Sequence, residues 1–287
     1  MIYVTHYFGF PQPLVEVKKL CREKRIYLIE DCALSLFSCG RKTELGSKGD
    51  ISVFNFPKSL PVPDGGVMLV NNPDLAADNW SMRMPPILKV LREMLPLIKR
   101  YVLYKSSGSS FLYPLLWSLL KKTQSIANHN EKYDTTFPDM PSSYYYDEKL
   151  NNRKISKITE RMLRTFDACK IVNRRRANFR KYLNLLSNIK GVDALYKELP
   201  EGVCPLYFPI IVDKRRRVCQ ELNALSIDAV AWWSGYHRHL PWSKYPDACF
   251  LKDSLLVLPV HQQLNDSHIE FITQKLLYVI GKIRACT

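Results

Sequence analysis

The stretch GDISVFNFPKSLPVPDGGVMLV, residues 49–70, decides the fold. It contains two short runs rich in β-branched and aromatic residues, 51–56 and 67–70, which predict two strands. The proline- and glycine-rich segment between these runs predicts a turn, and the glycines of residues 64–66 allow a close approach of the backbone. Lys58 falls just after the first predicted strand.

The residues before this stretch repeat the same strand and helix patterns. Residues 2–8 predict a strand, apolar residues at helical spacing over 14–24 predict a helix, and residues 26–30 predict a further strand. Asp31 stands at the carboxyl end of that strand. A strand–helix–strand order is typical of an α/β sheet, in which ligands bind beyond the carboxyl ends of the strands. We expect Asp31 and Lys58 to lie at that edge.

The rest of the chain predicts a second, smaller α+β unit. Residues 155–172 carry apolar side chains at steps of three and four, which predict one long basic helix. The later patterns predict, in order, a strand at 206–212, a helix at 215–225, strands at 227–233 and 254–260, and a final helix that begins at Asn265 or Asp266.

The composition is that of a globular protein. The 287 residues are 46% hydrophobic and 24% charged, which excludes a disordered, collagen-like or coiled-coil chain. The eight cysteines include no C-x-x-C pair, so we expect free thiols and no metal site. The first residues lack a secretory signal, and no run reaches the roughly 20 apolar residues that span a bilayer. These features favour a cytoplasmic protein without a transmembrane segment.

The net charge of +15 is concentrated in two stretches. Residues 94–130 contribute five basic residues and no acid, and residues 151–181 contribute eleven basic residues against two acids. A solvated helix face is favoured over polyanion binding for the second stretch, because no nucleic-acid-binding motif accompanies it. For the first stretch, a basic insertion packed on the protein is favoured over an interfacial contact with anionic lipid.

An aspartate and a lysine at neighbouring strand ends have several interpretations. They can be ordinary surface residues or form a salt bridge. Alternatively, the lysine amine can be a nucleophile that faces a carboxylate holding a cationic ring. Pyridoxal phosphate (PLP) needs both parts, an amine for the Schiff base and a carboxylate that keeps the pyridine nitrogen protonated. The spacing alone leaves these interpretations open.

The chain resembles the DegT/DnrJ/StrS family of PLP-dependent sugar aminotransferases, which have the fold type I architecture. The resemblance covers most of the chain and is weakest over residues 80–150. The segments that carry it, in order, are THYFGFPQP (5–13), LIEDCALSLFS (28–38), GSKGDISVFNFPKSLPVPDGG (46–66), VMLVNNP (67–73), NRRRANFRKYLNLL (173–186) and SLLVLPVHQQLNDSHIEFI (254–272). Their fixed order makes the resemblance specific.

The resemblance implies an α/β fold, the large domain of the aspartate aminotransferase-like PLP-dependent transferases, N-terminally incomplete, with a smaller C-terminal α+β domain. We therefore expect residues 1–150 to form a partial PLP-binding domain with a basic insertion at about 80–150. Residues 151–287 are expected to form the long basic helix and the small domain. Nothing in residues 1–30 resembles the family's helix start that cradles the phosphate. A truncated frame, a separate chain supplying that part, and a chain that no longer catalyses are the open explanations.

The resemblance also implies roles for individual residues. Lys58 would be the Schiff-base lysine and move protons during the transfer, and Asp31 would pair with the pyridinium nitrogen. Asn55 stands where the family usually has a serine that reaches the phosphate, and Leu34 where it commonly has a polar residue. His6 matches a histidine of the family and would have a structural or pocket-lining role.

His237 lies in an aromatic, histidine-containing segment that is comparable with a family loop near the substrate. A pocket role is one interpretation, and a surface or packing role is the other. His237 and His239 have H-x-H spacing, but a metal site would need a third ligand.

The implied function is PLP-dependent transfer of an amino group from a donor such as glutamate to a nucleotide-linked keto-sugar. This reaction would serve polysaccharide or O-antigen precursor biosynthesis, and the enzyme would be a homodimer. The alternative is a truncated, non-catalytic aminotransferase-like protein or partner subunit. A third and weaker hypothesis is a basic protein that binds anionic lipid or nucleic acid through residues 94–181.

Overall fold

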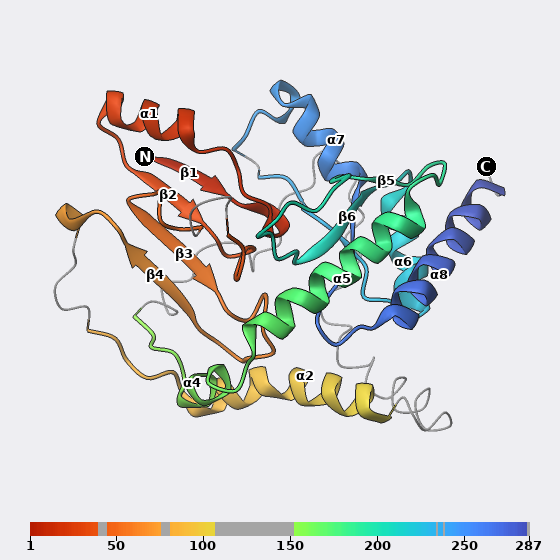
Figure 1. The fold of residues 1–287 in the computed structure, drawn as a ribbon, viewed down its shortest axis with the longest axis horizontal. Helices are drawn as coiled ribbons and strands as arrows, with labels where there is room; N and C mark the ends of the chain where they lie inside the picture. Colours follow the sequence, from red (N-terminus) through yellow and green to blue (C-terminus); the bar gives the residue numbers. More distant parts are fainter. Residues whose placement is uncertain (40–44, 76–80, 107–151, 234, 238, 286–287) are drawn as a thin grey trace.

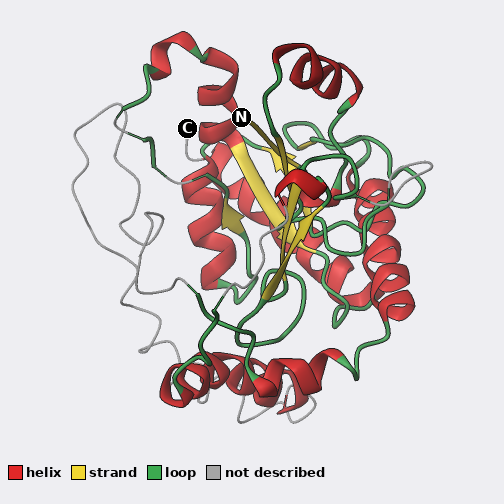
Figure 2. Cartoon of the chain, turned by 90° about the vertical axis from the view of Figure 1, so that its left-hand side faces the viewer, coloured by secondary structure: helices red, strands yellow, loops and turns green. Residues whose placement is uncertain are grey.

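The computed structural model describes residues 1–39, 45–75, 81–106, 152–233, 235–237 and 239–285. The domain boundary expected at residues 150/151 lies outside this part of the chain, as does most of the insertion expected at about 80–150. Strands occupy the middle of the molecule and helices surround them (Figure 2).

The first half of the chain forms a four-stranded sheet with the order β1-β2-β3-β4. Its strands are β1 (Ile2–Thr5), β2 (Leu28–Asp31), β3 (Ile51–Asn55) and β4 (Gly66–Val70). The first three strands are parallel, and β4 returns antiparallel to β3. Helix α1 (Val15–Lys24) connects β1 to β2 and lies beside β1 in Figure 1. The strand–helix–strand order predicted from the sequence is therefore confirmed.

The first strand is shorter than predicted. It ends at Thr5, and the chain then enters the 3-10 turn η1 (Tyr7–Gly9). Phe8 has a φ of 57°, which a strand cannot accommodate. Phe8 and Phe10 leave the sheet and are buried in the core of the second half of the molecule. The expectation of a strand through residue 8 is wrong because its last aromatic residues belong to another core.

The second half forms an antiparallel sheet with the order β5-β6-β8-β7. Its strands are β5 (Asp193–Ala194), β6 (Tyr207–Ile211), β7 (Val230–Ala231) and β8 (Leu255–Pro259). The strand predicted at 227–233 is reduced to the two residues of β7, whereas β6 and β8 are confirmed. Every residue of β8 is buried, so β8 lies at the centre of this core.

Helices cover the second sheet. They are α5 (Ala168–Leu186), α6 (Arg215–Ala224) and α8 (Asp266–Ala285), whereas the short helix α7 (Pro246–Ser254), which leads into β8, has no buried residue. Helix α5 packs against α8 and runs from the side of the first sheet towards the second (Figure 1). The Oδ1 atom of Asn265 accepts the backbone N–H of His268, so Asn265 rather than Asp266 caps α8.

The long helix predicted from residue 155 is wrong, because two helices occupy this region. Helix α4 (Lys157–Leu163) begins after Ser156, whose side chain accepts the N–H of Thr159. Helix α4 ends at Leu163, and the side chain of Asp167 caps the start of the next helix, α5. The helical spacing of apolar residues continues across residues 164–167, between the two helices, so the sequence pattern does not reveal that α4 ends and α5 begins.

Helix α2 (Ile87–Ser106) lies with α4 at the lower end of both views (Figures 1 and 2). It exposes large apolar side chains, including Leu88 and Leu95, and it contains Pro96. No helix in the described part of the chain is long and apolar enough to cross a membrane.

Candidate active site

The carboxyl ends of β1, β2 and β3 meet at one edge of the first sheet. In the parallel register, Thr5 pairs with Asp31, and Asp31 pairs with Val53. Paired residues of neighbouring strands point to the same face, and so do residues two positions apart. The side chains of Thr5, Asp31 and Asn55 therefore share one face of the sheet.

Asp31 is half-buried at this edge. Its Oδ1 atom accepts the backbone N–H of Ala33 at 2.9 Å, and its Oδ2 atom accepts the hydroxyl of Thr5 at 3.3 Å. A carboxylate offers about four lone-pair positions, so these two bonds orient Asp31 and leave it able to accept more.

Asn55 ends β3 and shapes the turn that follows. Its Oδ1 atom accepts the backbone N–H of Lys58 at 3.0 Å, while its Nδ2 group makes no hydrogen bond to a described residue. The side chain of Lys58 is exposed, and no ion pair joins it to Asp31. The structure thus places an exposed amine and a half-buried carboxylate after neighbouring parallel strands, without the salt bridge that was one interpretation of the sequence.

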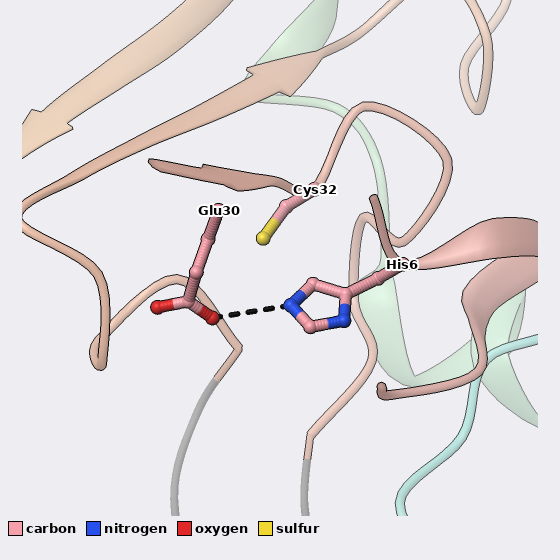
Figure 3. Close-up of side chains that lie close together, drawn as sticks. All are labelled: His6, Glu30 and Cys32. Carbon is pink, nitrogen blue, oxygen red and sulfur yellow. Dashed lines mark hydrogen bonds and ion pairs between the residues drawn. The ribbon is translucent and has the colours of Figure 1, made fainter. Parts of the chain in front are cut away.

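His6 lies in the interior and has no exposed surface. Its Nε2 atom is 3.1 Å from Oε2 of Glu30 (Figure 3). Its Nδ1 atom accepts the backbone N–H of Gln12 at 2.9 Å. Because Nδ1 accepts, the ring hydrogen must be on Nε2, which donates to Glu30. Both ring nitrogens therefore have partners inside the chain.

Glu30 was not singled out from the sequence, although it is a fully buried acid. Its carboxylate accepts the N–H of Gly46 at 3.2 Å, that of Lys48 at 2.6 Å, and that of Gly49. Burial by itself would raise the pKa of Glu30, but the hydrogen bonds from His6 and these backbone groups lower it overall. Through these hydrogen bonds, Glu30 connects the loop before β3 to strand β2. The sequence signal that could have identified Glu30 is an acid that ends an apolar strand pattern, next to Asp31.

His6, Glu30 and Cys32 form the only group of possible metal ligands in the described part of the chain, with ligand atoms within 4.8 Å of one another (Figure 3). Their chemistry does not suit a metal. The Nε2 atom of His6 carries the ring hydrogen, so it has no lone pair for an ion. Burial and the carboxylates of Glu30 and Asp31 raise the pKa of Cys32 to about 12. The group is a hydrogen-bonded cluster with a neutral thiol.

His237 lies in the loop after β7, in the second half of the molecule. Its Nδ1 atom accepts the N–H of His239 at 3.3 Å, and its carbonyl accepts the indole N–H of Trp242 at 2.9 Å. His237 is partly buried and lies outside the first sheet. Leu34 is 5% exposed, so it contributes apolar contacts in the loop after Asp31.

The part of the chain that carries Asp31, Asn55 and Lys58 has known relatives. Residues 1–93 match the DegT/DnrJ/EryC1/StrS aminotransferase family. The resemblance predicted from the sequence is thus confirmed over the stretch that contains the whole first sheet. We refer below to this stretch as the family-matched segment.

Two curated relatives are nucleotide-sugar enzymes. The dTDP-4-dehydro-2,3,6-trideoxy-D-glucose 4-aminotransferase of Saccharopolyspora spinosa is 25% identical over 292 residues, which cover 96% of this chain and 64% of that enzyme. The GDP-perosamine synthase of Vibrio cholerae is 32% identical over 78 residues, which cover 27% of this chain and 21% of the synthase. The chain therefore spans less than two thirds of the length of these relatives.

Solved structures of aminotransferases show that the shared fold extends beyond the family-matched segment. Helicobacter pylori PseC, an aminotransferase involved in the biosynthesis of pseudoaminic acid, superposes with a TM-score of 0.59 at 13% identity, over 98% of this chain and 66% of PseC. The aminotransferase from Psychrobacter cryohalolentis gives a TM-score of 0.59 at 17% identity, over 99% of this chain and 69% of that structure. These similarities confirm the predicted fold class.

Proposed function

We propose that this chain is a PLP-dependent aminotransferase that transfers an amino group to a nucleotide-linked keto-sugar. The proposal rests on one observation: Asp31 ends β2 and Lys58 follows the end of β3, the neighbouring parallel strand, within the family-matched segment. The relatives act in nucleotide-sugar metabolism, which supports a keto-sugar joined to a nucleotide as the amino acceptor. An amino donor such as glutamate completes the reaction.

The side chains present at this edge suit PLP. Asp31 has unused lone pairs that can accept the pyridine N–H, and Lys58 has an exposed amine that makes no ion pair with a described residue. The Nδ2 group of Asn55 can donate to a phosphate oxygen. The hydroxyl of Ser59, next to Lys58, is buried and has no partner among the described residues.

The chemistry that PLP supplies when bound is the withdrawal of electrons from the substrate carbon at which a proton is removed. In this proposal, Asp31 keeps the ring nitrogen protonated through its negative charge. Lys58 holds the cofactor and then moves the proton at its Nζ atom. Leu34 offers only apolar contact where the family commonly has a polar residue.

The proposed function also includes an organisation of the chain into two units. We propose a partial PLP-binding unit in residues 1–150, with an insertion at about 80–150, and a smaller unit in residues 151–287. His6 is assigned a structural role and His237 a place near the sugar. The enzyme is proposed to be a cytoplasmic homodimer, and a separate chain is proposed to supply the N-terminal part of the relatives.

The test is a visible absorbance spectrum of the purified chain mixed with PLP. We expect a band of bound cofactor in the native chain and in Lys24→Ala, a control at an exposed lysine of α1. Lys58→Ala should abolish the band. Absence of any Lys58-dependent band would contradict the proposal and favour the alternative, a non-catalytic aminotransferase-like protein. Amination of a nucleotide-linked keto-sugar by the chain with glutamate would then test the substrate class.

A further inference from the structure

The turn that carries Lys58 is closed by its own backbone. The N–H groups of Ser59 and Leu60 donate to the carbonyl of Phe56 at 2.9 and 2.8 Å, and Phe56 N–H donates to Gly65 at 3.1 Å. We call residues 56–66 the lysine turn. Its internal hydrogen bonds fix its shape but do not determine how it sits on the rest of the protein.

Arg175, in the second turn of α5, reaches the lysine turn from the other half of the chain. Its side chain is 2% exposed. Its Nη2 group donates to the carbonyl of Ser59 at 2.5 Å, and its Nε group donates to Oε1 of Gln262 at 3.0 Å. Ser59 directly follows Lys58, so the guanidinium is bound to the peptide unit next to the lysine.

The position of Arg175 is energetically unusual. A buried guanidinium normally needs a carboxylate partner, and Arg175 forms no ion pair with any described acid. Its neighbours on the helix differ: Arg174 is exposed and pairs with Asp266, and Arg176 donates to the carbonyls of Pro200 and Val203. Of the three consecutive arginines, Arg175 alone binds the lysine turn. The hydrogen bond from a charged donor to a carbonyl is strong and directional.

The other end of the lysine turn is held by α4. Asp64 accepts three hydrogen bonds at its Oδ1 atom, from the hydroxyl of Thr159 at 2.6 Å, the hydroxyl of Ser156 at 3.0 Å and the N–H of Ser156 at 3.2 Å. Ser156 is also the residue that caps α4. The start of α4 is thereby bound to a residue 92 positions earlier in the chain.

Apolar packing joins these two attachments. Leu60 and Val62 are buried together with Ile171 of α5, and Met162 of α4 and Phe56 pack against them. The lysine turn therefore contacts α4 and α5 at both ends and in the middle. These contacts come from one continuous part of the chain, the pair of helices that follows residue 155.

We propose that α4 and α5 fix the position of the lysine turn, with Arg175 and Asp64 as positioning residues for Lys58. The inference rests on the proposed function in that Lys58 is the residue that holds the cofactor. A displacement of about 1 Å at a reacting group is enough to lower a rate a hundredfold, so the attachment of this turn bears directly on the reaction. Neither positioning residue needs to touch the cofactor or the substrate.

The first test is hydrogen–deuterium exchange of the chain without cofactor. We expect Arg175→Gln to speed exchange in the lysine turn by about tenfold or more, because a hydrogen bond to a charged group is lost. Arg174→Gln removes the same charge from the adjacent, exposed position and should leave the turn unchanged. Exchange in β8 should stay unchanged in both variants, which separates local loosening from global unfolding.

Thr159→Val gives an independent measurement at the other end of the turn. It removes the hydroxyl that donates to Asp64 and keeps the shape of the side chain, so the turn is again expected to exchange faster. If Arg175→Gln does not fold, Thr159→Val still tests whether α4 and α5 fix the position of the lysine turn. Exchange within about twofold of the native rate in every folded variant of this pair would overturn the inference.

The second test measures which lysine PLP attaches to, by borohydride reduction and peptide mass analysis. We expect Lys58 to carry most of the label in the native chain and in Arg174→Gln, and a several-fold smaller share in Arg175→Gln. A native chain that shows no preference for Lys58 would contradict the proposed function. The exchange experiment would still decide whether α4 and α5 hold the lysine turn. An unchanged share in Arg175→Gln would count against the positioning role.

Discussion

The Nε2 atom of His6 lies 3.1 Å from Oε2 of Glu30, and neither side chain has any exposed surface. Glu30 is the neighbour of Asp31 on β2, but successive residues of a strand point to opposite faces. One acid is therefore committed to the interior, where it binds the loop before β3, and the next is presented at the edge with Lys58. The two adjacent carboxylates have separate tasks because of the strand geometry alone.

Glu30→Gln should lower the free energy of unfolding by about 2–4 kcal/mol, since a buried carboxylate with several N–H donors is replaced by an amide that can accept on one side only. The change is measured by urea denaturation at neutral pH. Glu23→Gln, at an exposed position of α1, should leave the unfolding free energy nearly unchanged. A loss as small as that of the control would mean that Glu30 does not stabilise the loop.

The contribution of Glu30 should disappear in acid. Its pKa is lower in the folded protein than in the unfolded chain, because the hydrogen bonds from His6 and the backbone outweigh the effect of burial. The stabilisation is therefore complete above the unfolded pKa of about 4.3 and is lost as the pH falls through the folded value. We expect the difference in unfolding free energy between the native chain and Glu30→Gln to shrink below that pH. Denaturation curves that show this difference growing in acid would contradict the assignment.

Cys32 should resist alkylation in the folded protein. Its pKa is raised to about 12, so the thiolate that reacts with iodoacetamide is scarce at about pH 8. Cys39 and Cys169 are exposed and serve as internal references. We expect Cys32 to be modified at least about a hundredfold more slowly than the references, as measured by peptide mass analysis. In urea the three rates should converge, and equal rates in the folded chain would be inconsistent with the buried cluster.

Alanine substitutions at two glycines should change the unfolding free energy in opposite directions. Gly9 has a φ of +94°, and a Cβ atom there would lie 2.1 Å from the carbonyl oxygen of Cys204. Gly9→Ala should therefore lower the unfolding free energy by about 3 kcal/mol or more. Gly281 is in α8, and outside the neighbouring helix backbone no atom lies within 4 Å of its Cβ position, so Gly281→Ala should raise the unfolding free energy by up to about 1 kcal/mol. Thermal denaturation of both variants checks the contrast, and equal effects would refute it.

The elements that the sequence predicts well are those whose pattern is local. The strands at 51–55 and 255–259 follow from short runs of β-branched, aromatic or apolar residues, and the helix at 215–224 follows from helical spacing within its own residues. The parallel pairing of β1 with β2 also follows from their strand–helix–strand order, in which α1 joins the two strands.

The features that the sequence does not predict depend on distant partners. Phe8 looks like a strand residue, and its place in the second core is set by aromatic neighbours such as Trp232, with ring centroids 5.1 Å apart. Arg175 looks like part of a solvated basic face, and its burial is determined by a carbonyl 116 positions away. Glu30 and Asp31 are equivalent in the sequence, and only the register of β2 assigns one to each face.

The contacts between the loops of the two halves of the chain have a consequence for how the protein is made. The hydroxyl of Ser38 donates to the carbonyl of Cys204, 166 positions later, and Phe8 accepts the N–H of Leu206. During translation, Phe8 and Phe10 leave the ribosome long before the strands and helices that cover them exist. At typical rates of about 5–20 residues per second, these aromatic side chains wait roughly ten seconds or more before they can be buried. The nascent chain thus exposes Phe8 and Phe10 to solvent for most of its synthesis.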